Sequence, residues 1–499
     1  MKRRIKKVAV LGSGIMGSGI ACHFANIGVQ VLLLDIAPKE TSELEKKKGL
    51  DITHKQVRNR IVNDNLTKAI KSKPAPLYHA AFKARIQTGN FEDDMHQIAT
   101  VDWIIEVVVE RLDIKNIVFE QVEQHRTPGT LISSNTSGIP IKFMNEGRSE
   151  DFQKHFTVTH FFNPPRYLKL FEVIPGPNCN VEVVDFLLYY GSRFLGKSTV
   201  LAKDTPAFIG NRIGIFCIQS LFHQIKKMGL TVEEVDKLTG PVMGRPSSAT
   251  FRTVDVVGLD TLVHVANGLH ENCPDDERRD VFELPDFIQK MMEEQWLGSK
   301  SGQGFYKKIK NDRGESEIQV LDLDTMTYRS KKKASFATLE KTKTIDNVTD
   351  RFPVLINGTD KAASFYRAVL GETFAYVQFR IPEIADELFR VDEAMKAGFG
   401  WQHGPFEIWD SVGLEAGIAL IKAAGQPVAP WIEALEASGA KTFYQLKENK
   451  KYYYNASKKS FEPIPGQEAF LILDNIRENK TVWQNKECSV IDLGDGILN

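Results

Sequence analysis

The sequence predicts an α/β fold over its first two hundred residues, followed by two mainly α-helical domains. Two observations predict the α/β part. Strand and helix patterns alternate up to about residue 200, and the first strand, helix and second strand form a βαβ unit. A third observation predicts the helical part, because part of the helical sequence that follows recurs later in the chain.

The βαβ unit at the N-terminus fixes the start of a parallel sheet. Residues 5–11 are small and β-branched, as in a short buried strand, and an apolar helix is expected over residues 15–27. This helix stops at Gly28, and a second strand over residues 31–34 ends in Asp35. Two parallel strands joined in this way require a right-handed crossover helix.

The same alternation continues after a polar segment. Strands are expected at residues 101–109 and 131–134, with a helix at 115–122 between them. The polar segment at 39–73 holds ten Lys and Arg against five Asp and Glu, so we expect an exposed helical arm with a local charge of +5. The α/β domain is assigned to residues 1–200.

The first helical domain is assigned to residues 201–310. The run Asp204-Thr205-Pro206 looks like a helix cap followed by a first-turn proline, and a nearly all-apolar helix then runs to Met228. Such a helix must be buried on most sides. Thr231 and Glu234 have the spacing of a capping box, which predicts the next helix.

Two stretches of the helical sequence match each other. The run at 255–260, which follows Val235-Asp236, corresponds to the run at 410–415, which follows Val391-Asp392. The spacing between the matching ends differs by one residue, and a Gly/Pro turn lies between them in both copies. The match predicts a duplicated helical domain.

The duplication divides the rest of the chain. A charged, weakly periodic segment at 311–350 is typical of a linker, and the second helical domain is assigned to residues 351–460. The tail at 461–499 ends in an alternating run from Cys488 that then turns, like a strand entering a hairpin. Because no partner strand is expected, we predict that the chain after about residue 470 is frayed or paired onto another edge.

Composition restricts the class of protein. The 499 residues include 64 Lys and Arg and 64 Asp and Glu, so no net charge attracts nucleic acid or an anionic membrane. Five cysteines without a CxxC spacing indicate neither a disulfide framework nor a metal site. The basic N-terminus resembles a signal peptide, but glycines interrupt its apolar stretch by Gly17, so a cytoplasmic protein is expected.

A glycine-rich motif of the form GxGxxG lies between the first strand and the first helix. Such a turn lets the backbone approach a pyrophosphate, which the N–H groups at the start of the helix then bind. Asp35 lies where a carboxylate accepts hydrogen bonds from an adenosine ribose and repels a 2′-phosphate, which favours NAD over NADP. The alternative is a turn that only packs strand on helix. The motif consists of Gly12, Ser13, Gly14, Ile15, Met16 and Gly17.

A histidine and a carboxylate are expected to meet on a hairpin. The strand at 156–162 and the returning strand at 168–174 place His160 and Glu172 on one face, directly opposite or one diagonal step apart. A carboxylate in that position orients the imidazole as a general base requires. The alternative is a structural ion pair. His155 is the competing histidine, and its parity places it on the other face of the strand.

The chain resembles the L-3-hydroxyacyl-CoA dehydrogenase family of fatty acid β-oxidation from residue 5 to about 310. The repeat resembles the second helical domain of the fused members, and both helical domains resemble the C-terminal domain of 6-phosphogluconate dehydrogenase. More narrowly, the chain is similar to the dehydrogenase part of a bacterial fused dehydrogenase/enoyl-CoA hydratase. The motifs that carry the resemblance are those at 12–17, 134–137, 160–164, 204–206, 211–212 and 300–302.

The resemblance implies a role for individual residues. His160 is the catalytic base and Glu172 its partner, while Ser137 and Asn211 hydrogen-bond the substrate oxygen. The nicotinamide half of the NAD site is lined by a further set, to which Ser137 also belongs: Glu110, Lys115, Asn163 and Lys300. One departure concerns the acyl-chain side of the pocket, because the segment 243–248 lacks the Gly-Pro-Phe-Glu turn that many relatives carry there and that this chain has at 404–407.

The expected reaction is NAD-dependent oxidation of an L-3-hydroxyacyl-CoA to the 3-ketoacyl-CoA. The resemblance further implies an acyl-CoA substrate, an internal pseudo-dimer made by the second helical domain, and association with a hydratase or thiolase. The basic arm either meets the 3′-phosphate of CoA or simply faces water. Two alternatives stay open, a related hydroxyacid dehydrogenase and a catalytically silent NAD-binding scaffold. Hydratase activity is not expected, because the tail resembles only the opening of a hydratase domain.

Overall fold

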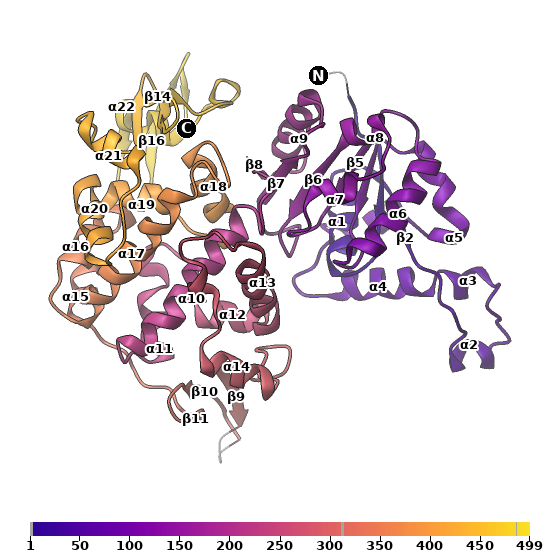
Figure 1. Cartoon of the computed structure of the whole chain (residues 1–499), viewed down its shortest axis with the longest axis horizontal. Coiled ribbons are helices and arrows are strands. Elements are labelled where there is room, and N and C mark those ends of the chain that lie inside the picture. The colour runs from indigo at the N-terminus through magenta and orange to yellow at the C-terminus, as the bar shows by residue number, and fades with distance from the viewer. Residues whose placement is uncertain (1–2, 311–313, 486) are drawn as a thin grey trace. The chain divides into compact units, whose positions relative to one another are not determined.

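The computed structural model describes residues 3–310, 314–485 and 487–499. Its contacts divide the chain into two compact units (Figure 1). Unit 1 comprises residues 1–216, 263–283 and 393–401, and unit 2 comprises the rest. Within the described residues, no helix is both long and apolar enough to span a bilayer.

Unit 1 is built on one eight-stranded sheet in the order β3-β2-β1-β4-β5-β6-β7-β8. The first six strands in this order are parallel, β7 is antiparallel to β6, and β8 is parallel to β7. The predicted α/β fold with a Rossmann-type parallel sheet is thereby confirmed. The strands are β1 (Lys7–Leu11), β2 (Gln30–Asp35), β3 (Ile86–Asn90), β4 (Trp103–Glu106), β5 (Leu131–Ser134), β6 (Phe156–Phe161), β7 (Leu170–Pro175) and β8 (Ser198–Leu201).

Helices cover both faces of this sheet. On one face, the ring of Trp103 packs edge-on against Phe24 of α1 (Ile15–Asn26) and Tyr190 of α9 (Val181–Arg193). On the other, Phe119 of α6 (Leu112–His125) packs against Phe152 of α8 (Glu150–His155) and Phe156. Alternate residues of the buried strands point to opposite faces, which explains why these strands are apolar throughout.

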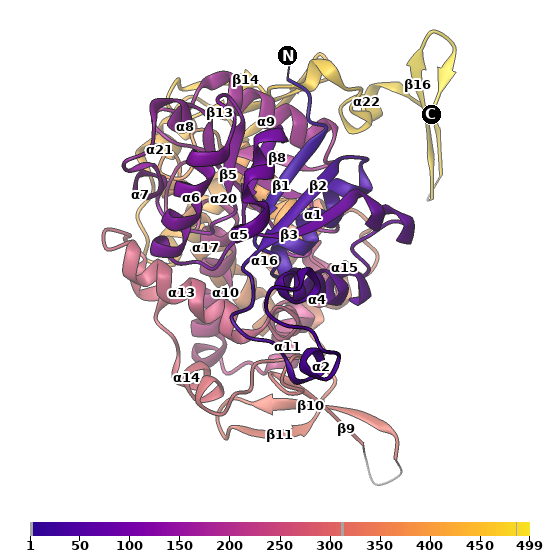
Figure 2. The ribbon, with the colours of Figure 1, turned by 90° about the vertical axis from the view of Figure 1, so that its right-hand side faces the viewer.

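The arm at 39–73 is helical, as expected. It contains α2 (Glu43–Lys47), α3 (Lys55–Arg58) and α4 (Arg60–Lys71), and Val62 and Leu66 of α4 are buried. Figure 2 shows β1, β2 and β3 side by side, with α4 and α2 below them. Three of the basic side chains, Lys46, Arg58 and Arg60, are already paired with carboxylates.

In unit 1, the structure shortens one predicted strand and adds two strands that were not predicted. The strand expected at 101–109 is limited to β4, and its last link to β1 is the hydrogen bond from the N–H of Val107 to the carbonyl oxygen of Leu11. The edge strands β3 and β8 were missed, because they are short and carry few apolar residues. The remaining α-helices among the described residues of the unit are α5 (Phe91–Asp94) and α7 (Ile141–Asn145), and two 3-10 helices span Ala80–Arg85 and Met95–Thr100.

The helix expected from Pro206 begins later, as α10 (Gly210–Lys227). Ala207 and Phe208 have φ of +61° and +51°, a left-handed conformation that no α-helix contains. The carboxylate of Asp204 does not cap this helix, since its Oδ2 accepts a hydrogen bond from the backbone N–H of Ile141. Residues 204–209 are therefore a turn before the helix.

Unit 2 contains most of both helical repeats. Three helices contribute residues to both units: α10, α13 (Leu259–Asn272) and α18 (Leu388–Phe399). The first repeat continues in α11 (Val232–Leu238), α12 (Phe251–Val257) and α14 (Asp286–Glu293). The second uses α16 (Val348–Asn357), α17 (Lys361–Phe379), α19 (Pro405–Val412), α20 (Leu414–Ala423) and α21 (Pro430–Ala437). The capping box predicted at Thr231 and Glu234 is present.

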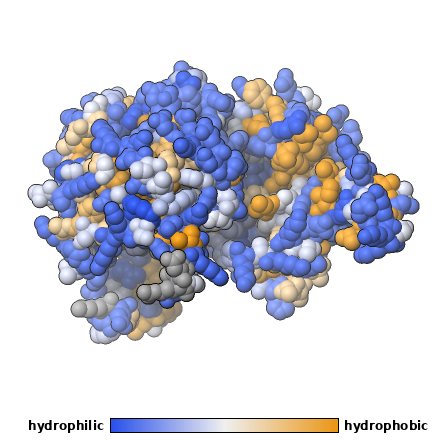
Figure 3. Space-filling view, turned by 90° about the horizontal axis from the view of Figure 1, so that it is seen from below, coloured by the Kyte–Doolittle hydropathy of each residue, from blue (hydrophilic) through white to orange (hydrophobic). Residues whose placement is uncertain are grey.

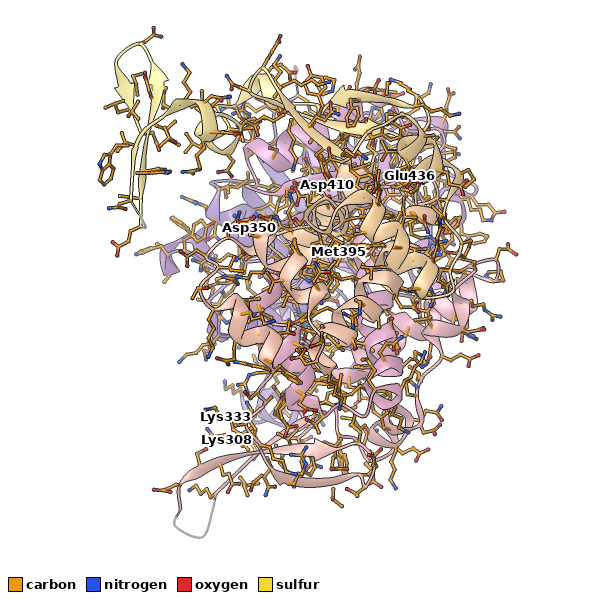
Figure 4. All side chains as sticks on the ribbon, turned by 90° about the vertical axis from the view of Figure 1, so that its left-hand side faces the viewer. Lys308, Lys333, Asp350, Met395, Asp410 and Glu436 are labelled. Atoms are coloured by element: carbon orange, nitrogen blue, oxygen red, sulfur yellow. The ribbon has the colours of Figure 1, made fainter. Side chains whose placement is uncertain are left out.

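The duplication is visible in the hydrogen bonds of the two repeats. Asp255 accepts the backbone N–H groups of Phe305 and Tyr306, and the hydroxyl of Tyr306 donates to Asp236 at 2.7 Å. In the second repeat, Asp410 accepts the N–H groups of Phe443 and Tyr444, and Tyr444 donates to Asp392 at 2.6 Å. Burial raises the pKa of Asp255 and of Asp410 to about 7. Asp410 lies among the helices of the second repeat (Figure 4).

Each repeat ends in a three-stranded antiparallel sheet, which the sequence analysis missed. Two strands of the first sheet, β10 and β11, lie within the expected linker at 311–350, so the structure differs from that prediction. The alternation of polar and apolar residues in these strands is weak, because one face of each sheet is exposed. The strands are β9 (Tyr306–Lys310), β10 (Ser316–Asp322) and β11 (Thr327–Ser330), then β12 (Tyr444–Lys447), β13 (Lys450–Asn455) and β14 (Ser460–Pro463). A helix follows the first sheet, α15 (Ala337–Thr342).

The tail also differs from its prediction in part. The strand and turn expected near the end are present as β16 (Ser489–Gly494) and β17 (Ile497–Leu498), but a partner was wrongly excluded. β16 pairs with β17 and with β15 (Thr481–Gln484), which follows α22 (Leu473–Lys480). The tail thus makes its own small sheet.

The two repeats contact each other within unit 2. The hydroxyl of Tyr366 on α17 donates to the carbonyl oxygen of Leu238 at the end of α11, at 2.8 Å. The backbone N–H of Gln402 donates to the carbonyl oxygen of Gly244, also at 2.8 Å. Both contacts join residues far apart in sequence, so the second repeat covers part of the first.

Candidate active site

The glycine-rich turn after β1 is shaped to receive an anionic group. Gly12 has φ +106°, and a Cβ there would lie 2.5 Å from the carbonyl oxygen of Val107. A Cβ at Gly17 would overlap the carbonyl of Gly12, so both positions require glycine. A Cβ at Gly14 would meet nothing within 4 Å, and no side chain caps the start of α1. The helix N–H groups therefore face open space, as pyrophosphate binding requires.

Asp35 is fixed beside this turn at the end of β2. Its Oδ2 accepts the backbone N–H of Ser13 at 2.7 Å and also the Ser13 hydroxyl, while Oδ1 accepts the N–H of Ile36. Asn65 of the arm donates to the Ser13 hydroxyl oxygen at 3.0 Å. The carboxylate is thus held at the position where an adenosine ribose is bound in sheets of this order.

Exposed apolar side chains follow three neighbouring strands. Ile15, Ile36 and Val109, which come after β1, β2 and β4, are 77%, 58% and 62% exposed. Figure 3 shows an apolar patch on the surface of unit 1. Large exposed apolar groups around a glycine turn and a fixed carboxylate fit the flat rings of a dinucleotide. The residues present therefore fit NAD.

A buried cluster of charges lies at the carboxyl ends of β4 and β5. The ammonium of Lys115 on α6 lies 2.9 Å from Oε1 of Glu106 and 3.2 Å from Oε2 of Glu110. Oε1 of Glu110 also accepts the backbone N–H of Ser137 at 2.9 Å and the hydroxyl of Thr136. Burial favours a higher pKa for Glu110, but Lys115 and these donors outweigh it, so that the pKa lies below its ordinary value.

Glu106 is the residue of this cluster that the sequence analysis missed. It is the last residue of β4 and is fully buried, with Ser134 of β5 donating to it. A charged residue closing an otherwise apolar strand, nine positions before a lysine, is the signal that could have found it.

His160 and Glu172 lie directly opposite each other on β6 and β7. Nδ1 of His160 is 2.6 Å from Oε2 of Glu172, and both side chains are buried. The rings of Phe162 and Phe208 pack against the imidazole, with centroids 4.8 and 5.6 Å away. With Nδ1 held by the carboxylate, Nε2 is left as the nitrogen that can accept a proton.

Glu172 is itself fixed by the turn that precedes α10. Its Oε1 accepts the backbone N–H groups of Ile209 and Gly210 at 3.0 and 2.9 Å. The left-handed conformation of Ala207 and Phe208 aims these two N–H groups at the carboxylate. The departure from the expected helix start thus has a local reason, because the turn orients the partner of the histidine.

Ser137 and Asn211 belong to two chain segments that are each tied to this pair of strands. The β5–β6 connection that carries Ser137 is tied to β6, since Oδ1 of Asn135 accepts the backbone N–H of Phe161 at 2.9 Å. Asn211 directly follows Gly210, whose N–H binds Glu172. Both side chains are partly exposed and belong to the same end of the sheet as His160.

Three other residues considered in the sequence analysis lie outside the buried clusters described above. Asn163 lies in the exposed turn between β6 and β7, two residues after the end of β6. Lys300 belongs to unit 2, where its ammonium pairs with Asp260. His155 closes α8 rather than lying on a strand, so the parity argument for it was wrong, and its Nδ1 is 2.8 Å from the carbonyl oxygen of Asp151.

A parallel sheet of this order, with a dinucleotide turn and a buried His–Glu pair beyond it, defines an NAD-binding dehydrogenase-type protein. Comparison with known proteins gives the family. Residues 7–205 match the sequence model of the 3-hydroxyacyl-CoA dehydrogenase NAD binding domain, and residues 208–308 match that of the C-terminal domain. The chain belongs to the 3-hydroxyacyl-CoA dehydrogenase family.

Individual relatives agree with this assignment. A probable 3-hydroxyacyl-CoA dehydrogenase of Bacillus subtilis is 43% identical over 498 residues, which are 100% of this chain and 62% of that protein. A putative fatty acid oxidation complex trifunctional enzyme of Rickettsia felis is 30% identical over 100% of this chain and 63% of its own length. The chain thus spans less than two thirds of these relatives. A 3-hydroxybutyryl-CoA dehydrogenase structure from Escherichia coli shares the fold, with a TM-score of 0.59, 20% identity and coverage of 87% and 99%.

Proposed function

We propose that the protein oxidises L-3-hydroxyacyl-CoA thioesters to 3-ketoacyl-CoA with NAD. The observation that carries this proposal is the buried pair of His160 and Glu172 at the same end of the sheet as the dinucleotide turn. Proton removal and hydride departure must occur at adjacent atoms of the alcohol, so a base has to stand beside the nicotinamide half of the cofactor. NAD, when bound, accepts the hydride from C3 of the substrate.

His160 removes the proton of the C3 hydroxyl group through Nε2. Glu172 keeps the proton of the ring on Nδ1 and stabilises the imidazolium that forms, because its oxygen lies 2.6 Å from that nitrogen. Ser137 and Asn211 donate hydrogen bonds to the substrate oxygen as it becomes a carbonyl. The phenyl rings around His160 exclude water from the proton-transfer step.

The remaining site residues are assigned to the binding of NAD. The turn at Gly12–Gly17 holds the pyrophosphate and Asp35 the adenosine ribose, while Glu110, Lys115 and Asn163 line the nicotinamide side. Lys300 is proposed as a further contact to the cofactor. The names of two relatives support a place in fatty acid oxidation and association with other enzymes of a fatty acid oxidation complex. The more specific role in β-oxidation and a cytoplasmic location are proposed from the sequence.

The experiment that tests the proposal follows the formation of NADH by its absorbance, with three substrates offered separately. We expect turnover of (S)-3-hydroxybutyryl-CoA and almost none of the (R) enantiomer, because base and hydride acceptor stand on fixed sides of C3. Free 3-hydroxybutyrate should react poorly, because it lacks the CoA part that orients the substrate. Turnover of the free acid at a rate equal to that of the thioester supports a hydroxyacid dehydrogenase instead, and binding of NAD without any turnover supports a silent scaffold.

A further inference from the structure

Glu106 is a buried carboxylate that receives only donors. Its Oε1 accepts hydrogen bonds from Lys115 Nζ at 2.9 Å and from the backbone N–H of Val108 at 2.7 Å. Its Oε2 accepts from Lys115 Nζ at 3.1 Å and from the hydroxyl of Ser134 at 2.5 Å. Burial raises the pKa of Glu106, and the ammonium of Lys115 with the donors on Val108 and Ser134 opposes that rise. The geometry favours the anion, because the ammonium of Lys115 lies within hydrogen-bond distance of both carboxylate oxygens.

The cluster around Glu106 carries one negative charge in excess. The single ammonium of Lys115 is shared between two carboxylates, Glu106 and Glu110, and the side chains of Lys115 and Glu106 are 1% and 0% exposed. The next charged groups in sequence, Arg111 and Asp113, pair with each other at the surface, so their charges cancel. Two anions against one cation in a buried site are screened little by salt.

The excess negative charge lies on the side of the sheet where the nicotinamide half of the cofactor is expected. In the sheet order found here, Asp35 at β2 marks the adenosine side, and the ends of β4, β5 and β6 lie on the other side of the switch point. Glu110 is the exposed end of the cluster, with 33% of its side chain accessible, and it binds the backbone of Ser137. The nicotinamide ring carries a positive charge when oxidised and none when reduced.

We propose that the cluster of Glu106, Lys115 and Glu110 stabilises the oxidised cofactor over the reduced one, with Glu106 supplying the excess charge from the interior. The proposal rests on the proposed function, in which the nicotinamide lies on the β4–β6 side. Glu106 is a positioning residue that acts through Lys115, and it touches neither substrate nor cofactor. Its role concerns the difference between the affinities for the oxidised and the reduced cofactor.

The test measures dissociation constants by titration, without any acyl-CoA, for NAD+, NADH and ADP-ribose. Glu106→Gln keeps the shape of the side chain and removes the charge. We expect the ratio of the NAD+ constant to the NADH constant to rise by roughly tenfold, the size expected for one charge in a partly buried site. For a two-electron couple, a tenfold change raises the reduction potential of the bound cofactor by about 30 mV. The ADP-ribose constant should stay unchanged, because this ligand lacks the nicotinamide.

Two further variants complete the design. Glu110→Gln removes the same excess charge at the accessible end of the cluster and should shift the ratio in the same direction, and it decides the question if Glu106→Gln does not fold. Glu120→Gln is the matched control, since it removes an exposed carboxylate of the same helix, α6, and should leave the ratio unchanged.

The outcomes separate this proposal from the proposed function. The proposal is overturned if the ratio of the NAD+ and NADH dissociation constants is unchanged in a folded variant that still binds ADP-ribose. It is also overturned if the binding of NAD+ and of NADH weakens equally. A ratio that falls also overturns it, because the sign is wrong for a lost negative charge. If the unaltered protein binds neither NAD+ nor ADP-ribose, the proposed function itself fails.

Discussion

Glu172 lies directly opposite His160 on the neighbouring antiparallel strand, and its second oxygen accepts two backbone N–H groups from the turn before α10. The carboxylate is therefore held from both sides, by the imidazole and by the main chain. An imidazole with one fixed partner has one defined ring orientation and one defined tautomer. The geometry prepares His160 for proton transfer before any substrate is bound.

Glu172→Gln should lower kcat by roughly 10²–10⁴, as loss of an orienting carboxylate does in other triads. The glutamine amide offers one acceptor where the structure requires two, at Nδ1 of His160 and at the N–H groups of residues 209 and 210. The dissociation constant of NAD should change little. The control Glu182→Gln alters an exposed glutamate on α9. A normal kcat for Glu172→Gln would show that the pair is only structural.

Asp35→Ser should narrow the preference for NAD over NADP, measured as the ratio of kcat/KM values. The substitution removes the acceptor for the ribose and the charge that repels a 2′-phosphate, and we expect the ratio to fall by roughly tenfold or more. Asp64→Ser, on the exposed side of α4, is the matched control. Equal use of both cofactors by the unaltered protein would contradict this assignment of Asp35.

The sequence alone predicts much of the site, because its chemistry depends on local patterns. The glycine turn, Asp35 and the pairing of His160 with Glu172 all follow from strand and helix periodicity with short spacings. The duplication of the helical domain could also be predicted, because it appears as a match between two short sequence patterns. Glu106 and the backbone N–H groups that bind Glu172 were not predictable in this way, because their partners are brought together only by the packing of separate strands and helices.

The small sheets of unit 2 were missed for a different reason. Their strands are short and half exposed, so polar residues occupy most positions, as in β9, where three of five residues are lysines. What stabilises the first sheet is contact with the helices. Arg329 of β11 pairs with Glu233 of α11 at 2.6 Å, and Val320 of β10 is fully buried.

The tyrosine hydroxyls of the two repeats should contribute equally to stability. Tyr306→Phe and Tyr444→Phe each remove one hydrogen bond to an aspartate, which costs about 1–3 kcal/mol. The acceptor is partly buried in the first repeat and buried in the second. Urea unfolding measures the loss. Tyr452→Phe is the control, because this residue of β13 lies on the partly exposed part of its strand. A loss in one repeat only would contradict the equivalence of the two clusters.

The basic arm should contribute to binding of CoA. Lys47 and Lys48 end α2 and are exposed, so Lys47→Glu combined with Lys48→Glu should raise KM for acyl-CoA several-fold by repelling the 3′-phosphate. KM for a truncated thioester without this phosphate should not change. Added salt should weaken only the acyl-CoA binding of the unaltered protein. The same change at Lys331 and Lys333 of unit 2 is the control, and equal effects on both substrates would exclude the arm.

His160→Gln tests the central claim most directly, with kcat for (S)-3-hydroxybutyryl-CoA and the dissociation constant of NAD measured on the same preparation. His155→Gln is the matched control, because it alters the nearby histidine that closes α8. The account predicts that His160→Gln lowers kcat by roughly 10²–10⁴ and leaves NAD binding nearly unchanged, since the side chain removes a proton but does not hold the dinucleotide. Turnover equal to that of the unaltered protein would contradict the assignment of His160 as the base.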